Sequence, residues 1–514
     1  MDASSKTQRI AIIDLGSNTA RMIVMQAVSG YSYRLIDEIR EVVRLRQGME
    51  NGRLSTDAIA RATFALRLFK RYCDSAGIDH IIASATSAVR DAENGEAFTS
   101  QVEQELELPL RILSGEEEAY YGALGVLNEV PLAHGFVVDI GGGSAQVTAV
   151  RHQQIHERQS VPLGALALTE LFVNSDPIDN DAFAKIEAHI ERNLNTIDWL
   201  TDIEDPSNHS VIGIGGTIRN LAKIAAEKRA YPLNTLHGFH LKLEEVEAAI
   251  ELLRKRPLKE RQQIRGLSKD RADIILPGAL VIRAIMARLN VQAITISQNG
   301  LREGLFFEYF WQHLTYPVVT KVRRFGVLNM ARNYHYQKAH SQHVRYLAGR
   351  LFNQLAPLHK LGPAERELLD AAALLHDLGT IISYHDHHKH SQTLIVNSGL
   401  PGFTPREIAL VALLTRYHRQ GTPSRREFKS ILNQKDKEIL LSLSAILRLS
   451  EYLERGRNGR VDDVTAVWDD HNMRITLIAD EYPAVEIWEA EKKAVKHVED
   501  AYGRKVILES ATAP

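Results

Sequence analysis

The stretch 137-VVDIGGGSAQV-147 is an apolar run that ends in Asp139, followed by three glycines and Ser144 before the chain turns apolar again. A glycine-rich turn between two strands exposes backbone N–H groups, and successive N–H groups form a concave anion site. The segment 12-IIDLGSNTARMIV-24 follows the same plan of strand, aspartate, glycine turn and second strand. The repeat predicts two matching β-hairpins, each near the start of one of two successive lobes.

A third glycine turn, 213-GIGGTIRNLA-222, joins an apolar run to a helical pattern. Free N–H groups at a helix start favour a bound phosphate. The chain has no Walker A pattern, which needs G-x-x-x-x-G-K-[ST]. The dinucleotide-binding fingerprint also fails, because Ile218 stands where glycine or alanine is required. The three turns therefore indicate a phosphate site of another kind.

Asp14 and Asp139 end the strands that lead into the first two turns. A carboxylate beside a bound phosphate normally needs a cation between the two, and Mg²⁺ with its water shell fits that role. Small hydroxyl and amide side chains follow in both turns and add hydrogen-bond donors. The pattern predicts a magnesium-assisted phosphate site.

Short β-branched runs alternate with helical periodicity up to about residue 310. The strand-like runs cover residues 9–14, 20–28, 80–86, 136–140, 145–150, 210–214 and 293–297. The helical stretches cover residues 55–76, 88–107, 116–127, 181–200 and 243–254. Strands that alternate with helices predict an α/β fold for this part of the chain.

The pattern changes twice further along the chain. Beyond Pro317 helix follows helix to about Glu454, which predicts an all-helical domain. The runs 464–468 and 474–479 then indicate a hairpin, and an amphipathic helix over 488–503 precedes a final short strand. This organisation predicts four domains, at residues 1–130, 131–312, 313–455 and 456–514.

The overall composition is that of an ordinary globular protein, with 514 residues, 44% hydrophobic and 25% charged. Lysine and arginine (62) nearly balance aspartate and glutamate (64), so nucleic acid is not an expected partner. A single cysteine, Cys73, excludes an intramolecular disulfide framework and fits a reducing compartment. The polar start MDASSKTQRI does not resemble a signal peptide, and no apolar run approaches the ~18 residues of a membrane span. We expect a cytoplasmic protein with no membrane partner.

The charge balance hides an asymmetry. Residues 316–460 hold about 22 Lys and Arg, about 11 Asp and Glu, and about ten His. Solvated helix faces explain such an excess, and so does a basic surface that helps to hold an anionic substrate. The second explanation predicts a channel for a long anion.

Two further motifs carry residues suited to phosphate chemistry. In 113-LSGEEEAYYGALG-125, Ser114 and Glu117 form a capping-box pattern that leaves Glu118 without a capping role. A carboxylate beside a phosphate site can deprotonate water, although the local pattern alone favours a helix surface for Glu118. Arg90 lies in a helix start after a strand, where bidentate phosphate binding and a surface ion pair with a neighbouring acid are equally compatible.

The helical part contains 374-LLHDLGTIISYHDHHKHS-391, in which His376 and Asp377 are adjacent. With His343 upstream, the order follows the metal-ligand plan of the HD phosphohydrolases, His then His-Asp then Asp. The expected last aspartate is missing, and Glu451 or Glu454 stands in that region. We favour a structural role, a hydrogen-bonded His–Asp pair within packed helices, over a metal site here.

Taken in order, the motifs DLGSNTARMIV, ATSAVRDAENG, LSGEEEA, VDIGGGSAQV, GIGGTIRNLA and SQNGLREGL resemble the exopolyphosphatase/guanosine-pentaphosphate phosphohydrolase (Ppx/GppA) family. The match covers roughly residues 10–310, and the tail resembles the HD-like helical domain and small α/β module of the long bacterial exopolyphosphatases. The resemblance implies an α/β actin-like ATPase (ribonuclease H-like) core of two lobes with the active site between them. It also implies Mg²⁺-dependent release of terminal orthophosphate from inorganic polyphosphate by a homodimeric enzyme.

The resemblance assigns a role to each motif. Glu118 becomes the catalytic base, which reverses the local interpretation, and Asp14 and Asp139 become the metal ligands. The phosphate-binding residues would be Gly16, Ser17, Asn18, Thr19, Arg90, Gly141, Gly142, Gly143, Ser144, Gly215, Gly216 and Thr217. His343, His376 and Asp377 are further candidates, for a metal in the helical domain.

One position departs from the family pattern. Gln146 stands where the family commonly has glutamate after GGGS, and an amide cannot act as a base and is a poorer Mg²⁺ ligand. This leaves three alternatives open beside a polyphosphatase: a guanosine pentaphosphate 5′-phosphohydrolase, a catalytically weakened nucleotide- or polyphosphate-binding regulator, and a kinase of the same fold.

Overall fold

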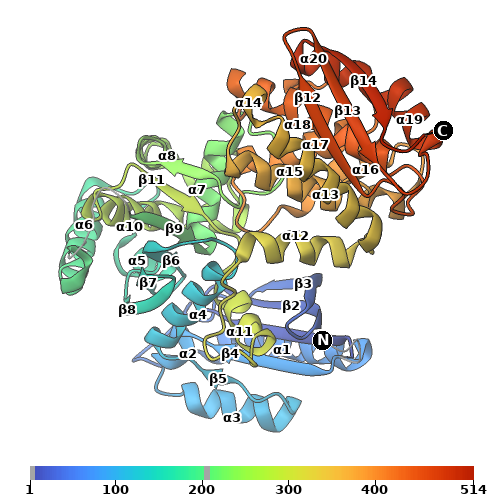
Figure 1. The fold of residues 1–514 in the computed structure, drawn as a ribbon. Coiled ribbons are helices and arrows are strands. Elements are labelled where there is room, and N and C mark those ends of the chain that lie inside the picture. Colours follow the sequence, from blue (N-terminus) through green and yellow to red (C-terminus); the bar gives the residue numbers. More distant parts are fainter. Residues whose placement is uncertain (1–5, 202–208, 514) are drawn as a thin grey trace. The chain divides into compact units, whose positions relative to one another are not determined.

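The computed structural model describes residues 6–201 and 209–513. The chain forms two compact units, one made of Met1–Ala230 with Leu236–Val322 and the other of Tyr231–Thr235 with Arg323–Pro514. Figure 1 labels their helices and strands. We call them unit 1 and unit 2 and describe each by itself.

The first sheet of unit 1 has the order β3-β2-β1-β4-β5. Its strands are β1 (Gln8–Leu15), β2 (Thr19–Val28), β3 (Ser32–Val42), β4 (His80–Ala85) and β5 (Arg111–Ile112). The first three form an antiparallel meander, whereas β4 runs parallel to β1 and β5 parallel to β4. The helices that follow these strands are α1 (Thr56–Ala76), α2 (Ser87–Arg90), α3 (Gly95–Leu106) and α4 (Gly115–Leu127).

The second sheet of unit 1 repeats this plan in the order β10-β11-β9-β6-β7-β8. Its strands are β6 (His134–Ile140), β7 (Ala145–Arg151), β8 (Gln154–Val161), β9 (Ser210–Ile214), β10 (His240–Lys242) and β11 (Ala293–Ile296). Again three antiparallel strands come first and β9 lies parallel to β6, with β11 parallel to β9. The repeated topology confirms the predicted actin-like core of two lobes.

Helices connect and cover the second sheet. They are α5 (Ala165–Phe172), α6 (Asn180–Leu194), α7 (Gly215–Lys228), α8 (Leu243–Arg254), α9 (Leu258–Arg261), α10 (Ile275–Arg288) and α11 (Leu301–Phe310), with the short helices η1 (Asp198–Thr201) and η2 (Lys269–Arg271). α10 is almost wholly buried, so its uniformly apolar sequence shows no amphipathic period for a sequence pattern to detect.

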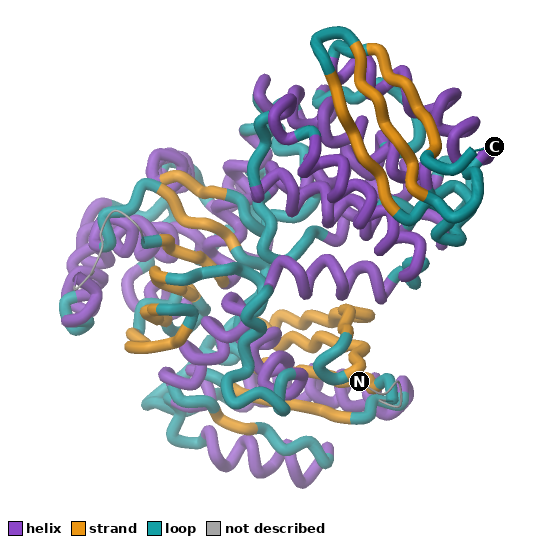
Figure 2. Tube along the Cα trace, viewed as in Figure 1, coloured by secondary structure: helices purple, strands orange, loops and turns teal. Residues whose placement is uncertain are grey.

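Unit 2 is helical up to a small sheet of order β12-β13-β14, whose strands stand side by side in Figure 2. Its helices are α12 (Val322–Asn333), α13 (Lys338–Gln354), α14 (Ala356–His359), α15 (Pro363–Leu375), η3 (Leu378–Ile381), α16 (His387–Ser398), α17 (Pro405–Tyr417), η4 (Arg426–Phe428) and α18 (Gln434–Leu453). The end of the chain forms β12 (Asp463–Trp468), β13 (Asn472–Ile478), α19 (Ala484–Ala490), η5 (Glu491–Val495), α20 (Lys496–Tyr502) and β14 (Lys505–Ser510). These elements confirm the predicted helical region, hairpin, helix and final strand.

The structure differs from the sequence expectation in two elements. The helix expected over 88–107 is two helices, because the chain turns sharply before Gly95, where a Cβ atom would lie 2.0 Å from the carbonyl oxygen of Val89. Strand β3 was not expected, because most of its residues are exposed or half-buried and it therefore lacks an apolar alternation.

No helix among residues 6–201 and 209–513 is long and apolar enough to cross a membrane. Cys73 is buried in α1, and burial raises the pKa of its thiol to about 11. A thiol in this state is a packing residue of the core, as a structural role predicts.

Helices α4 and α11 approach each other through glycines. A Cβ atom on Gly304 would lie 1.9 Å from the carbonyl oxygen of Tyr121, and one on Gly125 would lie 2.3 Å from the carbonyl oxygen of Gly300. Side chains at these positions would force the two backbones apart. The close crossing brings the first turn of α4 and the turn before α11 to the same region of unit 1.

Gly304→Ala is therefore expected to lower the free energy of unfolding by roughly 3 kcal/mol, the upper part of the usual overpacking range. Hydrogen exchange of amides in α4 and α11 would report the loss locally. Gly122→Ala is the matched control on α4, because its Cβ atom would meet only the tip of the Ile214 side chain, at 3.3 Å. Equal exchange rates in the two variants would contradict the close-crossing account.

Candidate active site

The three glycine turns and the starts of α4, α7 and α11 converge on one cavity of about 130 Å³ in unit 1. Most of the residues predicted from the sequence line it: Asp14, Gly16, Ser17, Asn18, Thr19, Glu118, Asp139, Gly141, Gly142, Ser144, Gln146, Gly215 and Gly216. They come from segments separated by up to about two hundred residues, so the fold brings together what the motifs suggested one by one.

The two hairpin turns have the same internal geometry. Gly16 N–H donates to the carbonyl of Thr19 at 3.1 Å, and Gly141 N–H donates to the carbonyl of Ser144 at 3.0 Å. Each turn thus closes tightly over four residues and connects an antiparallel pair of strands. The sequence repeat therefore corresponds to a repeat in three dimensions.

The two turns also touch each other. A Cβ atom on Gly143 would lie 2.8 Å from Ser17 Oγ and 2.4 Å from Ser87 Oγ, and these two hydroxyls are 2.9 Å apart. A Cβ atom on Gly142 would meet Ser17 and Asn18 at 3.3–3.4 Å. Backbone N–H groups from both lobes can approach one anion only because the glycines leave this space open.

The third turn closes against the second aspartate. Gly215 has φ +86°, and a Cβ atom there would lie 2.2 Å from Asp139 Oδ1. Glycine alone accommodates both the left-handed backbone and this contact. The turn leads directly into α7, whose N-terminal N–H groups are suited to phosphate.

Asp14 and Asp139 are the carboxylates placed to hold a cation. Burial raises the pKa of each to about 6, against the lowering influence of nearby arginines, Arg302 first for Asp14 and Arg219 first for Asp139. Both side-chain polar atoms of Asn18, in the adjoining turn, are buried without a hydrogen-bond partner among the described residues. Carboxylate and amide oxygens are ligands that Mg²⁺ prefers, so the residues present fit a hard divalent cation.

The sequence analysis missed four arginines that line the cavity: Arg21, Arg219, Arg271 and Arg302. Burial, and then the neighbouring guanidinium groups, lower the pKa of Arg21 to about 9. Burial likewise lowers the pKa of Arg271 to about 10. Buried cations that repel one another are poised to accept an anion.

Three of these arginines stand inside motifs quoted above, and their sequence context could have singled them out. Arg21 belongs to DLGSNTARMIV, Arg219 to GIGGTIRNLA and Arg302 to SQNGLREGL, whereas Arg271 stands in none of the motifs. The four arginines face four carboxylates in the lining, those of Asp14, Glu118, Asp139 and Glu303. A divalent cation would give this balanced set a net positive charge toward phosphate.

Glu118 lies in the wall of the cavity and is 9% exposed. The capping box of Ser114 and Glu117 is present, as predicted, so Glu118 is free of a capping role. Burial raises the pKa of Glu118 to about 7, although the Arg90 guanidinium lowers it. The local expectation of a helix surface for Glu118 is wrong, because the first turn of α4 faces the cavity.

Arg90 does not line the cavity. It is the last residue of α2, and its guanidinium donates to the carbonyl of Leu113 at 2.9 Å and forms an ion pair with Glu118. It also lies 3.4 Å from Asp91 Oδ1. The structure thus places Arg90 against the carboxylate of Glu118 rather than in the wall that an anion would contact.

Two further predicted residues stand behind the lining. Gly143 packs against the hydroxyls of Ser17 and Ser87, and Thr217 is buried in α7 with no hydrogen-bond partner for its hydroxyl among the described residues. These residues shape the turns around the cavity. Their predicted role in phosphate binding stays a prediction.

Gln146 holds Glu118. Its side-chain Nε2 donates to Glu118 Oε2 at 3.0 Å and lies 2.8 Å from Ser144 Oγ and 3.1 Å from Ser160 Oγ. A glutamate in this place would put two carboxylates at hydrogen-bond distance, where like charges raise a pKa. The amide in this chain therefore positions the buried carboxylate without adding charge.

In unit 2, His376 and Asp377 lie in a buried polar cluster with Glu451. The upstream histidine at the cluster is His340, which the sequence analysis missed, and it lies 3.1 Å from Glu451. His343 instead contacts the carbonyl oxygen of Val461 through Nε2 at 2.8 Å. Both histidines are on α13, three residues apart, so the sequence pattern did not distinguish them.

The fold and the cavity define a class: an actin-like protein with a phosphate site between two lobes. The sequence profile of the Ppx/GppA phosphatase family matches residues 23–313, and that of its domain III matches residues 322–487. The chain therefore belongs to the Ppx/GppA phosphatase family.

Solved structures agree with this assignment. A Ppx/GppA family member from Aquifex aeolicus is 27% identical over 60% of this chain and 99% of its own, with a TM-score of 0.52. An exopolyphosphatase from Cytophaga hutchinsonii is 25% identical over 59% of this chain and 98% of its own, with a TM-score of 0.55. Both span a fraction of the chain comparable to unit 1.

The buried Glu118 predicts the pH dependence of phosphate release. A general base works when deprotonated, so kcat/KM should rise with pH through an apparent pKa near 7. Arg90→Gln should move this acidic limb to higher pH, because the guanidinium lowers the pKa of Glu118. Arg111→Gln, which removes the ion pair to the neighbouring Glu117, is the control and should leave the limb in place. An unmoved limb in Arg90→Gln would exclude Glu118 as the titrating base.

Proposed function

We propose that the protein is an exopolyphosphatase that removes terminal orthophosphate from inorganic polyphosphate. The observation that carries the proposal is the cavity lining, which combines three phosphate-type glycine turns with four arginines. None of the described residues that line it is aromatic, so the cavity offers no ring on which a nucleobase could stack. The likeness to the Cytophaga hutchinsonii exopolyphosphatase supports the same substrate.

The reaction requires a water molecule to attack the terminal phosphorus in line with the leaving oxygen. Glu118 accepts a proton from this water, while the Gln146 amide and the Arg90 guanidinium hold its carboxylate in place. Orthophosphate leaves on one side and the shortened polyphosphate on the other. The proton then passes from Glu118 to solvent.

Charge dispersal is the task of the remaining groups. Backbone N–H groups of the hairpin turns and the lining arginines face the equatorial oxygens of the transferred phosphoryl group. Asp14 and Asp139 would hold Mg²⁺, which neutralises charge developing on the phosphate oxygens when it is bound. The glycine contacts keep these donors fixed, so little reorganisation accompanies the reaction.

Glu118→Gln keeps the size and the hydrogen-bonding shape of the side chain but removes the base. We expect kcat for polyphosphate to fall by ~10²–10⁴-fold with KM little changed. Glu117→Gln is the matched control, since Glu117 caps α4 from the preceding position and should cost stability rather than turnover. A near-normal kcat in Glu118→Gln would refute the assignment of the base.

The substrate is tested by phosphate release from long-chain polyphosphate and from guanosine pentaphosphate at matched concentrations, with and without Mg²⁺. We expect Mg²⁺-dependent release with a higher kcat/KM for polyphosphate, because the cavity recognises phosphate and lacks a base-stacking surface. A higher kcat/KM for guanosine pentaphosphate would overturn the substrate while leaving the hydrolase assignment intact. Tight binding of either compound with no turnover under any divalent ion would instead indicate a regulator.

Three expectations from the sequence stay predictions. The basic excess over residues 316–460 predicts that long anions bind with a stronger salt dependence than short ones. The homodimer and the cytoplasmic location likewise accompany the proposed function.

A further inference from the structure

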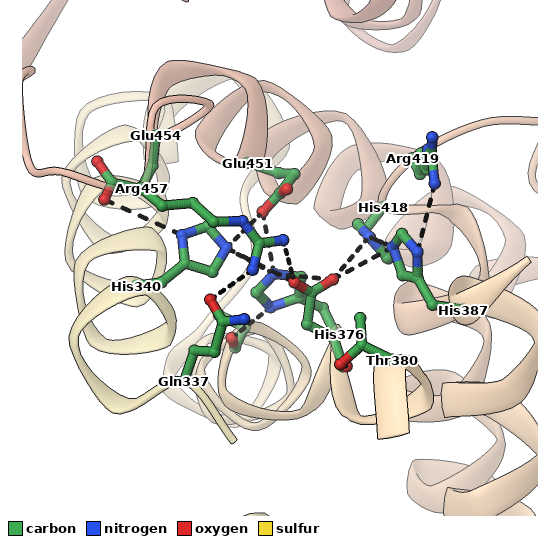
Figure 3. A network of polar contacts seen from close by, with 12 residues as sticks. Gln337, His340, His376, Thr380, His387, His418, Arg419, Glu451, Glu454 and Arg457 are labelled. Carbon is green, nitrogen blue, oxygen red and sulfur yellow. Dashed lines mark hydrogen bonds and ion pairs between the residues drawn. The ribbon is translucent and has the colours of Figure 1, made fainter. Parts of the chain in front are cut away.

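Unit 2 contains a buried cluster of four histidines and two carboxylates, shown in Figure 3. The side chains come from five helical segments that are distant in sequence. They are His340 of α13, His376 and Asp377 at the end of α15, His387 of α16, His418 at the end of α17 and Glu451 of α18. Each is less than 7% exposed. A polar group of this size inside a helical core needs a physical explanation.

The backbone decides which ring nitrogens face the cluster. His376 Nδ1 lies 2.8 Å from the carbonyl oxygen of Ala373, and His418 Nδ1 lies 2.7 Å from that of Thr415. A carbonyl oxygen only accepts, so both Nδ1 atoms carry the hydrogen. The Nε2 atoms of the two neutral rings therefore present lone pairs to the cluster, the arrangement that histidine ligands have when a second partner fixes the tautomer.

His387 follows the same pattern less strictly. Its Nδ1 lies 2.8 Å from the carbonyl oxygen of Tyr384 and 3.3 Å from Arg419 Nη1. The carbonyl is the closer partner and assigns the hydrogen to Nδ1. The Nε2 atom of His387 then also faces the cluster as a lone pair.

The facing atoms form two groups of three. In the first, His340 Nε2, His376 Nε2 and Glu451 Oε2 are separated by 3.3, 3.1 and 2.9 Å. In the second, His387 Nε2, His418 Nε2 and Asp377 Oδ1 are separated by 3.2, 3.2 and 3.7 Å. Two ligands at about 2.0–2.1 Å from one ion with a tetrahedral angle lie roughly 3.3–3.4 Å apart. Both groups match this spacing.

The carboxylate oxygens that face the imidazoles lack hydrogen bonds. Among the described residues, no hydrogen bond of acceptable geometry reaches Asp377 Oδ1 or Glu451 Oε2, and both side chains are more than nine-tenths buried. Oxygen lone pairs that face nitrogen lone pairs without a proton or ion between them are repulsive. The cluster therefore has the donors of a cation site.

Charge leads to the same requirement. Arg457 Nη2 lies 2.5 Å from Asp377 Oδ2 and supplies one positive charge from outside the two groups. Glu451 remains, and Glu454, which is also buried, lies 4.0 Å from His340. With neutral imidazoles the buried set is negative, and a divalent cation would balance it.

We propose that this cluster is a transition-metal centre, with His340, His376 and Glu451 as one three-ligand site and His387, His418 and Asp377 as the adjoining one. Imidazole-rich sites select first-row transition ions such as Zn²⁺, Mn²⁺ or Fe²⁺ over Mg²⁺. Three protein ligands leave a coordination position open on each ion. The inference is independent of the proposed phosphatase activity, because none of these residues belongs to unit 1.

The test uses the full chain with Asp14→Asn and Asp139→Asn, which remove the cleft carboxylates as a source of bound metal. After chelation, the protein is dialysed against Co²⁺, and bound metal is measured by mass spectrometry and by the visible absorption of coordinated Co²⁺. We expect at least one equivalent of Co²⁺ and a rise in the midpoint of thermal unfolding. Absence of bound Co²⁺ would overturn the proposal and leave a proton-balanced ion-pair network.

Variants in the same background locate the ion. His376→Asn should reduce bound Co²⁺ by more than half and change the absorption spectrum. His497→Asn is the matched control, a buried histidine of unit 2 that contacts Ser444 rather than the cluster. If His376→Asn does not fold, Glu451→Gln keeps the side-chain size and should weaken Co²⁺ binding at least tenfold. Unchanged Co²⁺ content in a folded His376→Asn or Glu451→Gln would show that the ion lies elsewhere.

Discussion

The two hairpin turns of unit 1 meet with no side chain between them, and the site depends on this contact. Gly142 and Gly143 of the second turn lie against Ser17 and Asn18 of the first, and Gly164 N–H donates to the carbonyl of Gly143 at 3.3 Å. A methyl group at Gly143 would collide with hydroxyls of the first lobe. Because the turns cannot separate without losing the anion site, the lobes, the aspartates before each turn and the helix starts are positioned together.

Charge balance is the second constraint on the cavity. Arginines and carboxylates line it in equal number, and their burial shifts the pKa values of both classes toward neutrality. Such groups are costly unless a ligand completes them. Gln146 fits this logic, because it fixes Glu118 by a hydrogen bond where a carboxylate would have added to the repulsion.

Much of the fold could be predicted from local pattern, and the misses have physical causes. The hairpin repeat, the capping box of α4 and the change from strands to helices all follow from short-range sequence periodicity. The exposed strand β3 carries no apolar alternation, and the break between α2 and α3 comes from a contact at Gly95. The lining arginines were missed because an arginine in a motif gives no sign of the direction in which its side chain points.

The sequence by itself determined the two glycine hairpins, their aspartates and the family, because turn geometry and motif order are properties of neighbouring residues. Only the tertiary structure decided that Glu118 is buried in a cavity wall, that Arg90 binds it, and that His340 rather than His343 joins the unit 2 cluster. The reason is geometric: the rotation of a helix about its axis is decided by what it packs against. Side chains three residues apart on one helix then meet different partners.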